Sequence, residues 1–279
     1  MATIKKYIKA LLPPLVFSIV HRLTKSKAIE KKAEIWSGNF ESWEQAQALC
    51  SGYDSNVILE TCKASLLKVK NGEAVYERDS VLFDEIQYSF GLLAALERAA
   101  LENDGILNVV DFGGSLGSTY FQNLDFLKSC KSVSWNIVEQ PHFVACGKQF
   151  FEDENLKFYH SIEDCLKNCK VNVLVLSSVL QYLDKPHDWL KKFVDYDFSF
   201  ILLDRTSFVE GVDDLLTIQD VPDEIYKASY PAWFFNKLKL EKILLKNYKL
   251  ISYFDNGFTP PTTVNGINRV YWNGIILRK

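Results

Sequence analysis

An aspartate followed by three glycines is the clearest chemical feature of this chain. Asp111 ends a run of apolar residues typical of a buried strand, and Gly113, Gly114 and Gly117 come soon after it. Because glycine permits sharp turns and close approach of a ligand to the backbone, this spacing predicts a strand, a tight turn and a helix with a hydroxyl cap. Such a turn suits a nucleoside, although ordinary strand-to-helix connections also use glycine.

The carboxylate of Asp111 indicates which kind of nucleoside the turn would bind. A dinucleotide places its diphosphate against backbone N–H groups and a helix N-terminus, where a neighbouring carboxylate would repel it. S-adenosylmethionine instead carries an ammonium and a sulfonium, which a carboxylate attracts directly or through water. Asp111 therefore favours S-adenosylmethionine over NAD.

A second carboxylate follows the next predicted strand, at residues 133–138. Glu139 stands at the end of this strand and can accept hydrogen bonds from both hydroxyls of an adenosine ribose. NAD enzymes use an acidic residue in the same way, but the interval from Asp111 to Glu139 is longer than their usual ~20 residues. We place Gln140, the next residue, in the same site.

Two more apolar runs, at 171–176 and 198–203, predict strands that are buried on both faces of a parallel sheet. Ligands bind at the C-terminal ends of such strands, so the polar residues that follow each run are candidates for a site. These residues are Ser177, Ser178, Gln181, Asp204, Arg205 and Thr206.

Length and composition agree with one large enzyme-sized domain. The chain has 279 residues, of which 48% are hydrophobic, so it can bury a full core. A net charge of −3 gives no global basic surface and does not suggest a nucleic-acid partner. The six cysteines include no Cys-x-x-Cys pair, which favours a reduced, cytoplasmic chain, and no cluster has metal-ligand spacing.

The pattern divides the chain into an arm over 1–32, a helical cap region over 33–100 and an α/β domain over 101–279. In the cap region, aromatic residues over 36–43 and apolar spacing over 81–100 are typical of helices. We expect the α/β domain to be Rossmann-like, with a doubly wound seven-stranded sheet. A helix over 236–247 and strands over 249–254 and 270–277 would close this sheet with an antiparallel hairpin.

The arm holds eight basic residues and a single acid, Glu30. Its apolar stretch over 11–20 is shorter than the ~20 residues of a membrane span and contains two prolines. No small-residue cleavage pattern follows, so a signal peptide is not expected. Two interpretations remain: peripheral contact with anionic lipid at the inner face of the membrane, or a helix packed on the α/β domain.

From about Leu107 to Lys279 the chain resembles the class I S-adenosylmethionine-dependent methyltransferases. Residues 111–117 resemble the glycine-rich motif of that superfamily, and Glu139 resembles its acidic residue that binds the ribose. Residues 176–183 resemble its motif at the fourth strand. Ser115 replaces the usual middle glycine. Together with residues 76–80 and 204–206, these motifs are similar to a family of putative methyltransferases associated with bacterial surface-polysaccharide gene clusters.

The residues and the resemblance together imply a set of site residues. The implied cofactor-binding residues are Asp111, Gly113, Gly114, Ser115, Gly117, Glu139, Gln140, Ser177, Ser178 and Gln181. The candidates for binding the acceptor are Arg205, Tyr230 and Trp233, because Tyr230 and Trp233 lie where methyltransferases of this class carry acceptor-specificity segments. A hydroxyl acceptor usually requires a base, for which His187 and Asp204 are the candidates.

The resemblance implies an enzyme that transfers a methyl group to a hydroxyl or amine of a small-molecule or saccharide acceptor, with S-adenosylmethionine as cofactor. One alternative is an NAD-dependent sugar oxidoreductase or epimerase, but the carboxylate of Asp111 would repel the diphosphate of NAD. Another is a non-catalytic scaffold that has retained a nucleoside pocket, which the fold alone does not exclude.

Overall fold

The computed structural model describes residues 35–51, 55–222, 225, 228–255 and 257–279. Residues 35–279 form one compact unit. The arm predicted over 1–32 lies outside the described residues, so both of its interpretations stay predictions. No described helix is long and apolar enough to cross a membrane.

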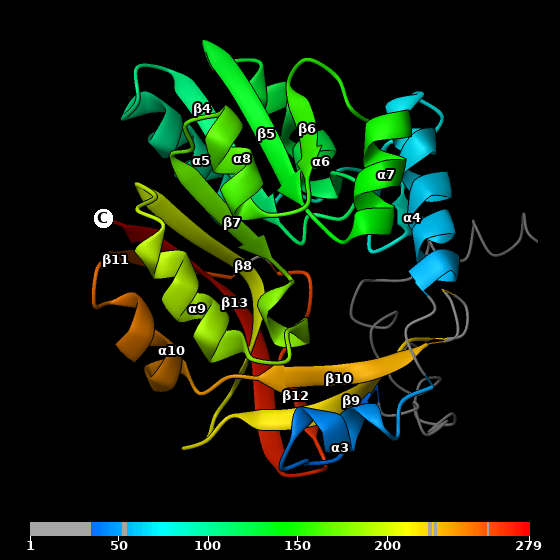
Figure 1. Cartoon of the computed structure of the whole chain (residues 1–279). Coiled ribbons are helices and arrows are strands. Elements are labelled where there is room, and N and C mark those ends of the chain that lie inside the picture. The colour runs from blue at the N-terminus through cyan, green and yellow to red at the C-terminus, as the bar shows by residue number, and fades with distance from the viewer. Residues whose placement is uncertain (1–34, 52–54, 223–224, 226–227, 256) are drawn as a thin grey trace, which may run out of the picture. The chain divides into compact units, whose positions relative to one another are not determined.

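The unit is built around one large twisted sheet (Figure 1). Five of its strands are parallel to one another, and β13 and β11 continue it antiparallel at one edge, where β12 also pairs with β13. Across the sheet the strands are β11 (Lys249–Phe254), β13 (Asn268–Arg278), β8 (Phe200–Val209), β7 (Val173–Ser177), β4 (Ile106–Phe112), β5 (Ser132–Val138) and β6 (Leu156–Tyr159), with β12 at Thr262–Val264. The prediction of a doubly wound, Rossmann-like sheet of seven strands with an antiparallel C-terminal hairpin is confirmed, with β12 as a short addition.

The order of the strands creates a switch point between β4 and β7. From β4 the chain proceeds outward to β5 and β6, then returns to place β7 on the other side of β4. Connections therefore leave these two strands in opposite directions, which opens a crevice at their C-terminal ends. The fold thus directs the glycine motif after β4 and the serines that end β7 into the same space.

Two hydrophobic cores cover the two faces of the sheet. One core contains buried side chains of the helices α4 (Ser55–Lys70), α5 (Phe90–Leu101), α6 (Ser118–Leu127) and α7 (Pro141–Phe150). The other contains buried side chains of α8 (Ile162–Asn168), α9 (Pro186–Asp195) and α10 (Lys237–Leu244), together with the short 3-10 helix η1 (Leu180–Tyr182). Because both faces are covered, the central strands carry the continuous apolar runs that the sequence shows.

A second, three-stranded antiparallel sheet lies at the C-terminal end of the main sheet (Figure 1). It consists of β1 (Trp36–Ser37), β9 (Leu215–Asp220) and β10 (Ser229–Phe234), and the short helix α3 (Trp43–Gln47) packs against β9 and β10. The predicted helical character of residues 36–43 therefore holds only from Trp43. Trp36 belongs to a strand because its backbone pairs with Gln219, a partner far away in the sequence.

The structure also corrects the helix expected over 81–100. Its first part is the strand β3 (Val81–Phe83), which pairs with β2 (Tyr76–Arg78) in a hairpin, and the helix α5 begins only at Phe90. Asp79 and Ser80 form the two-residue turn of this hairpin with positive φ angles of 52° and 71°. Positive φ at both positions is the geometry of a type I′ turn, which suits the twist of two paired strands. Turn geometry therefore prevails over the helical spacing of the apolar residues.

Candidate functional site

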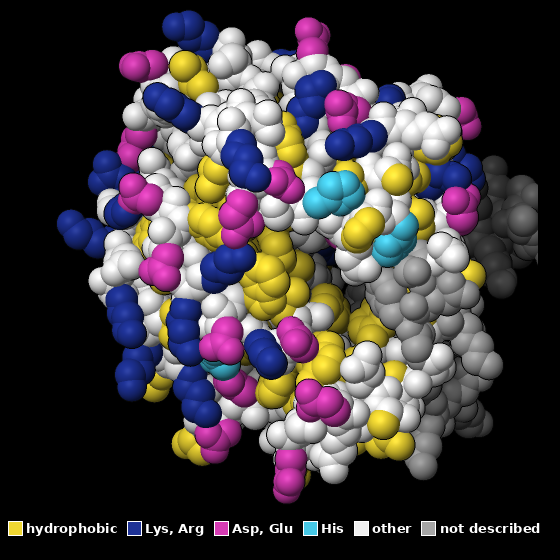
Figure 2. Space-filling model, viewed as in Figure 1, with side chains coloured by type: hydrophobic (Ala, Val, Ile, Leu, Met, Phe, Trp, Pro, Cys, Tyr) yellow, Lys and Arg dark blue, Asp and Glu magenta, His cyan; other side chains and the backbone are white. Residues whose placement is uncertain are grey.

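A cavity of about 850 Å³ opens at the C-terminal ends of β4, β5 and β7 and beside Asp204 and Arg205, which lie in the middle of β8. We call the lining residues of these four strands, with the turns that follow β4, β5 and β7, the floor of the cavity. The hairpin β2–β3 and the three-stranded sheet with α3 and η1 provide its other walls. In Figure 2, hydrophobic side chains gather around a hollow near the middle of the visible face. The volume is large enough for a nucleoside together with a small acceptor.

The structure brings most of the predicted site residues to this cavity. The predicted residues that line it are Gly113, Gly114, Ser115, Glu139, Gln140, Ser177, Ser178, Asp204, Arg205 and Tyr230. Six others do not line it, namely Asp111, Gly117, Gln181, Thr206, His187 and Trp233. The first four of these lie within or directly behind the floor, whereas the last two belong to other contacts.

The turn after β4 requires glycine at two positions. At Gly113, which has a φ of +70°, an added Cβ would lie 2.3 Å from Cγ2 of Val179. At Gly114 an added Cβ would lie 2.5 Å from the carboxyl carbon of Asp111. Both contacts are too short for a real side chain, so the backbone of the turn forms this part of the floor and is exposed to a ligand.

Asp111 lies behind this turn and is almost completely buried, with 1% of its surface exposed. Its Oδ2 accepts a hydrogen bond of 3.1 Å from Nε1 of Trp135, while Oδ1 has no hydrogen-bond partner among the described residues. Burial raises the pKa of Asp111 to about 7, against the lowering effect of the Trp135 hydrogen bond. A buried carboxylate with one unsatisfied oxygen is costly and would gain from a nearby cation or a bound water.

Glu139 stands at the end of β5, at the edge of the cavity. Its Oε2 accepts a hydrogen bond of 2.7 Å from the backbone N–H of Gln140. Burial raises the pKa of Glu139 to about 7, while the backbone N–H groups of Gln140 and Ser115 act in the opposite direction. The carboxylate is thus oriented by its own backbone beside the glycine turn, with capacity to accept further hydrogen bonds from a ligand.

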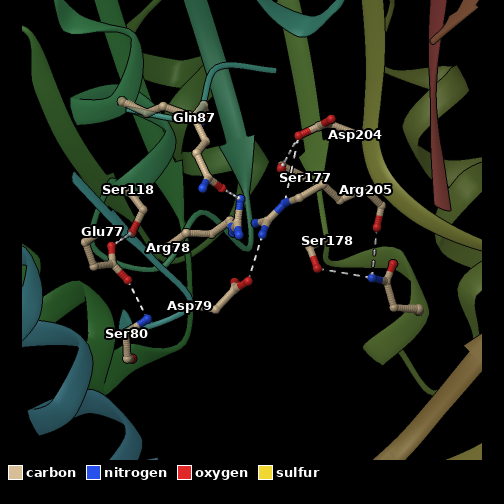
Figure 3. A network of polar contacts seen from close by, with 12 residues as sticks. Glu77, Arg78, Asp79, Ser80, Gln87, Ser118, Ser177, Ser178, Asp204 and Arg205 are labelled. Atoms are coloured by element: carbon tan, nitrogen blue, oxygen red, sulfur yellow. Dashed lines mark hydrogen bonds and ion pairs between the residues drawn. The ribbon is translucent and has the colours of Figure 1, made fainter. Parts of the chain in front are cut away.

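Side chains tie the end of β7 to the middle of β8. Ser177 donates a hydrogen bond of 2.9 Å to Asp204, and the buried amide of Gln181 donates to the hydroxyl of Ser178 at 3.1 Å and to the backbone carbonyl of Arg205 at 3.2 Å (Figure 3). Gln181 therefore positions the floor from behind and does not line it.

A β-bulge places two consecutive residues of β8 in the cavity. Leu203 pairs with Ile275 and Thr206 with Asn273, so that Asp204 and Arg205 together oppose the single residue Gly274. Arg205 has a φ of 49°. Neighbouring residues of a regular strand point to opposite faces, and the bulge removes this alternation. Thr206, the next residue, is fully buried and does not line the cavity.

Hydrogen bonds and an ion pair hold the two side chains of the bulge in place. Asp204 accepts a hydrogen bond of 2.9 Å from Ser89 in addition to that from Ser177. Arg205 forms an ion pair of 2.9 Å with Asp79 at the tip of the hairpin and lies 3.9 Å from Asp204. Burial lowers the pKa of Arg205, but the charges of Asp79 and Asp204 outweigh it and raise this pKa overall.

His187 and Trp233 do not line the cavity and make structural contacts instead. Nε2 of His187, in the first turn of α9, lies 2.6 Å from Oδ2 of Asp214, which also accepts a hydrogen bond from the backbone of Asn236. Trp233 donates its indole N–H to the backbone carbonyl of Leu183. The position of His187 soon after the fourth-strand motif suggested a place in the site, but α9 directs its side chain toward Asp214. Of the two candidate bases, only Asp204 lines the cavity.

The sequence did not identify Glu77 as a site residue. This carboxylate is buried in the hairpin, where it accepts hydrogen bonds from the backbone N–H of Ser80 at 2.5 Å and from the hydroxyl of Ser118 at 2.6 Å. Burial raises its pKa. Because Ser118 begins the helix after the glycine turn, Glu77 joins the hairpin to the floor. The resemblance over residues 76–80 was the available signal.

Four residues that carry no charge form a further part of the cavity, which we call the aromatic wall. They are Trp43, Tyr182, Gln219 and Tyr230. The hydroxyl of Tyr182 donates a hydrogen bond of 2.9 Å to Oε1 of Gln219. The rings of Tyr182 and Tyr230 pack edge to face, with their centres 5.3 Å apart. Aromatic faces with an adjacent amide can bind a ring that carries hydroxyl groups.

No family model and no curated protein sequence matches this chain. Solved structures do match, and 203 chains are similar. One is a S-adenosylmethionine-dependent methyltransferase from Clostridium acetobutylicum, with 10% identity, coverage of 67% of this chain and 89% of that chain, and a TM-score of 0.42. Another is the magnesium protoporphyrin IX methyltransferase of Synechocystis, with 13% identity, coverage of 81% and 100%, and a TM-score of 0.41.

A third similar structure is the N-terminal domain of EvdMO1, crystallised with S-adenosylhomocysteine and D-fucose. It is 11% identical, covers 81% of this chain and 97% of that chain, and has a TM-score of 0.43. At this level of identity and TM-score the similarities do not identify a function.

Proposed function

We propose that this protein is a S-adenosylmethionine-dependent methyltransferase. The observation that carries the proposal is the joint position of a glycine turn, a buried aspartate behind it and a half-buried glutamate beside it at the ends of β4 and β5. This combination supplies a backbone surface and two carboxylates within one cavity. It suits a nucleoside that carries positive charge and suits a diphosphate poorly.

The residues fit the parts of the cofactor one by one. Glu139 would accept hydrogen bonds from the ribose hydroxyls, and the backbone at Gly113 and Gly114 would contact the methionine portion. Asp111 supports this turn and retains one unsatisfied oxygen, so a bound ammonium or sulfonium would stabilise its charged form directly or through water. Ser115 holds a positive φ of 53° in the turn. The turn thus keeps a conformation suited to ligand binding without the usual middle glycine.

The cofactor, when bound, would supply an electrophilic methyl group, which would pass in line to the acceptor while the thioether S-adenosylhomocysteine leaves. The contribution of this chain is alignment, because holding an acceptor oxygen or nitrogen at attack distance lowers the entropic part of the barrier. The aromatic wall would orient the acceptor ring. Asp204 lies in the cavity, but hydroxyl groups hold both of its carboxylate oxygens, so its clearest role is to fix the end of β7 to the middle of β8 and to orient the Arg205 side chain.

We infer further that the acceptor is a small molecule or a saccharide, methylated on a hydroxyl or amine. The aromatic wall supports this class because Tyr182, Gln219 and Tyr230 combine ring faces with amide and hydroxyl groups. The resemblance to methyltransferases of surface-polysaccharide gene clusters supports a glycan precursor as the acceptor. Trp233 does not line the cavity, so Tyr230 is the stacking candidate in this proposal.

Calorimetric titration with S-adenosylhomocysteine and, in parallel, with NAD tests the proposed cofactor. We expect micromolar binding of S-adenosylhomocysteine and no saturable binding of NAD. Glu139→Gln should weaken binding about tenfold to a hundredfold, because hydrogen bonds to a charged group contribute about 1.5–3 kcal/mol. Glu154→Gln, a change at an exposed glutamate away from the cavity, is the matched control and should have no effect.

NAD binding in place of S-adenosylhomocysteine would support the oxidoreductase alternative and overturn the proposal. A second measurement separates an enzyme from a scaffold. Incubation with isotopically methyl-labelled cofactor and a panel of nucleotide sugars should transfer label to at least one acceptor. Tight cofactor binding with no transfer to any glycan, amine or hydroxyl compound would support a non-catalytic nucleoside-binding protein.

A further inference from the structure

Arg78 differs from the other arginine in the cavity in how its charge is balanced. Arg205 forms an ion pair with Asp79 and lies near Asp204. Arg78 also lines the cavity, yet it forms no ion pair with any residue that the structure describes. Among the described residues its hydrogen-bond partner is the neutral side-chain oxygen of Gln87, at 2.7 Å.

The guanidinium of Arg78 is nevertheless held in one orientation. Its central carbon lies 4.9 Å from the ring centre of Phe83 and 4.3 Å from that of Phe258. Contacts with aromatic rings at these distances fix a guanidinium plane and leave its N–H edge to form hydrogen bonds. Gln87 is itself fixed, because its backbone carbonyl accepts a hydrogen bond from Gln122.

The two arginines direct positive charge to one region of the cavity. In Figure 3 the side chains of Arg78 and Arg205 point toward one another. The charges of both arginines lower the pKa of Tyr76, although burial dominates and raises it to about 12. Asp79 forms an ion pair with Arg205, whereas no described carboxylate forms an ion pair with Arg78, so the N–H edge of Arg78 is the one left for an anionic ligand.

We infer that Arg78 anchors an anion subsite, in which a carboxylate or a phosphate of a ligand binds to its N–H edge beside Arg205. A guanidinium fork fits both groups with two parallel hydrogen bonds. The anion has two plausible sources, the carboxylate of the methionine portion of the cofactor or an acidic group on the acceptor. The first source rests on the function proposed above. The second source does not depend on which cofactor the protein binds.

Titration of Arg78→Gln with two adenosine ligands distinguishes the sources. S-adenosylhomocysteine and 5′-methylthioadenosine share the nucleoside, but only the first carries a carboxylate. If the cofactor provides the anion, the variant binds S-adenosylhomocysteine at least tenfold more weakly and 5′-methylthioadenosine within twofold of the unchanged protein. Arg78→Lys should lose less affinity than Arg78→Gln, since lysine keeps the charge but not the fork.

If the acceptor provides the anion, both adenosine ligands bind the variant normally. Glucuronate or glucose 1-phosphate then binds the protein loaded with S-adenosylhomocysteine, and Arg78→Gln removes that binding. Arg98→Gln is the matched control, because Arg98 lies on α5 in an exposed ion pair with Glu102. The control should leave every affinity unchanged.

Two results would overturn the subsite. One is unchanged binding of all four ligands in Arg78→Gln. The other is an equal loss of 5′-methylthioadenosine and S-adenosylhomocysteine, which would mean that Arg78 only shapes the hairpin. If the unchanged protein binds neither adenosine ligand, the proposed function fails by itself. Glucuronate and inorganic phosphate titrated into the ligand-free protein then decide the subsite, because their saturable binding, lost in Arg78→Gln, would support it and its absence would exclude it.

Discussion

The floor of the cavity and its aromatic wall are built in different ways. The floor is formed mainly where parallel strands end, and it combines backbone turns with the carboxylates of Asp111, which is buried, and Glu139, which is half-buried. The aromatic wall comes from an antiparallel sheet and η1, and its members Tyr182, Gln219 and Tyr230 carry no charge. Under the proposed function, the floor would bind the charged nucleoside and the wall would contact the second ligand.

The largest effect is expected from a side chain in the glycine turn. Gly113→Ala should lower the free energy of unfolding by about 2–4 kcal/mol, because the new Cβ meets Val179 and the position has a positive φ. Binding of S-adenosylhomocysteine should be lost. Chemical denaturation and calorimetry measure the two effects.

Gly72→Ala provides the matched control for backbone strain alone. Gly72 has a similar φ of +75°, but an added Cβ would meet no atom within 4 Å. We expect a loss of about 1 kcal/mol and normal ligand binding. If the two variants behave alike, the close contact of Gly113 with Val179 is not what shapes the floor.

A second prediction concerns the cost of the buried carboxylate. The pKa of Asp111 is about 7 in the folded protein, above the ordinary value of 3.8. Between these two pH values the folded state keeps a proton that the unfolded state has lost, so stability falls as the pH rises toward 7. Asp111→Asn should therefore stabilise the protein at pH 8 by about 1–3 kcal/mol more than it does at pH 5.

Denaturation curves at the two pH values measure this difference. Asp125→Asn, at an exposed position of α6, is the control and should give the same change at both. The same Asp111→Asn variant should bind S-adenosylhomocysteine more weakly, since the floor then lacks one negative charge. A variant that is less stable at pH 8 than at pH 5, relative to the unchanged protein, would contradict the burial argument.

Changes in the aromatic wall should weaken the use of the acceptor and leave cofactor binding intact. Gln219→Ala and Tyr230→Ala should reduce methyl transfer to an accepted substrate by about tenfold, through KM, because each removes hydrogen bonds or ring contacts worth about 1 kcal/mol. Affinity for S-adenosylhomocysteine should stay within twofold. A larger loss of cofactor binding than of acceptor binding would show that the two regions are not separate.

The smallest effect is expected at His187. His187→Ala removes the contact with Asp214, which lies outside the cavity, so stability should fall by about 1 kcal/mol. Cofactor affinity and the rate of methyl transfer should not change. A rate reduced a hundredfold or more, with the fold intact, would instead make His187 the base and move the reacting groups away from the floor.

The two regions also differ in how far their residues were predictable. Asp111, Glu139 and Ser177 follow apolar runs that identify strand ends, and the rule that ligands bind at such ends places these residues together. The contacts of the walls join distant segments. Asp79 reaches Arg205 across 126 positions, and Tyr182 reaches Gln219 across 37. No local pattern encodes these pairings.

Local geometry explains the remaining differences. The type I′ turn at Asp79 and Ser80 turned part of a predicted helix into a hairpin, and this hairpin brings Glu77 and Arg78 to the cavity. The bulge opposite Gly274 brings Arg205 into the same space as Asp204. Both features depend on positive φ angles at residues other than glycine, which sequence periodicity does not reveal.

The most direct test of the account is a crystal structure of the complex with S-adenosylhomocysteine. We predict that both ribose hydroxyls lie within hydrogen-bond distance of the Glu139 carboxylate. The amino-acid portion should cross the backbone at Gly113 and Gly114, with the sulfur facing the aromatic wall. A ligand bound elsewhere, or a ribose that points away from Glu139, would contradict the assignment of the floor as the cofactor site.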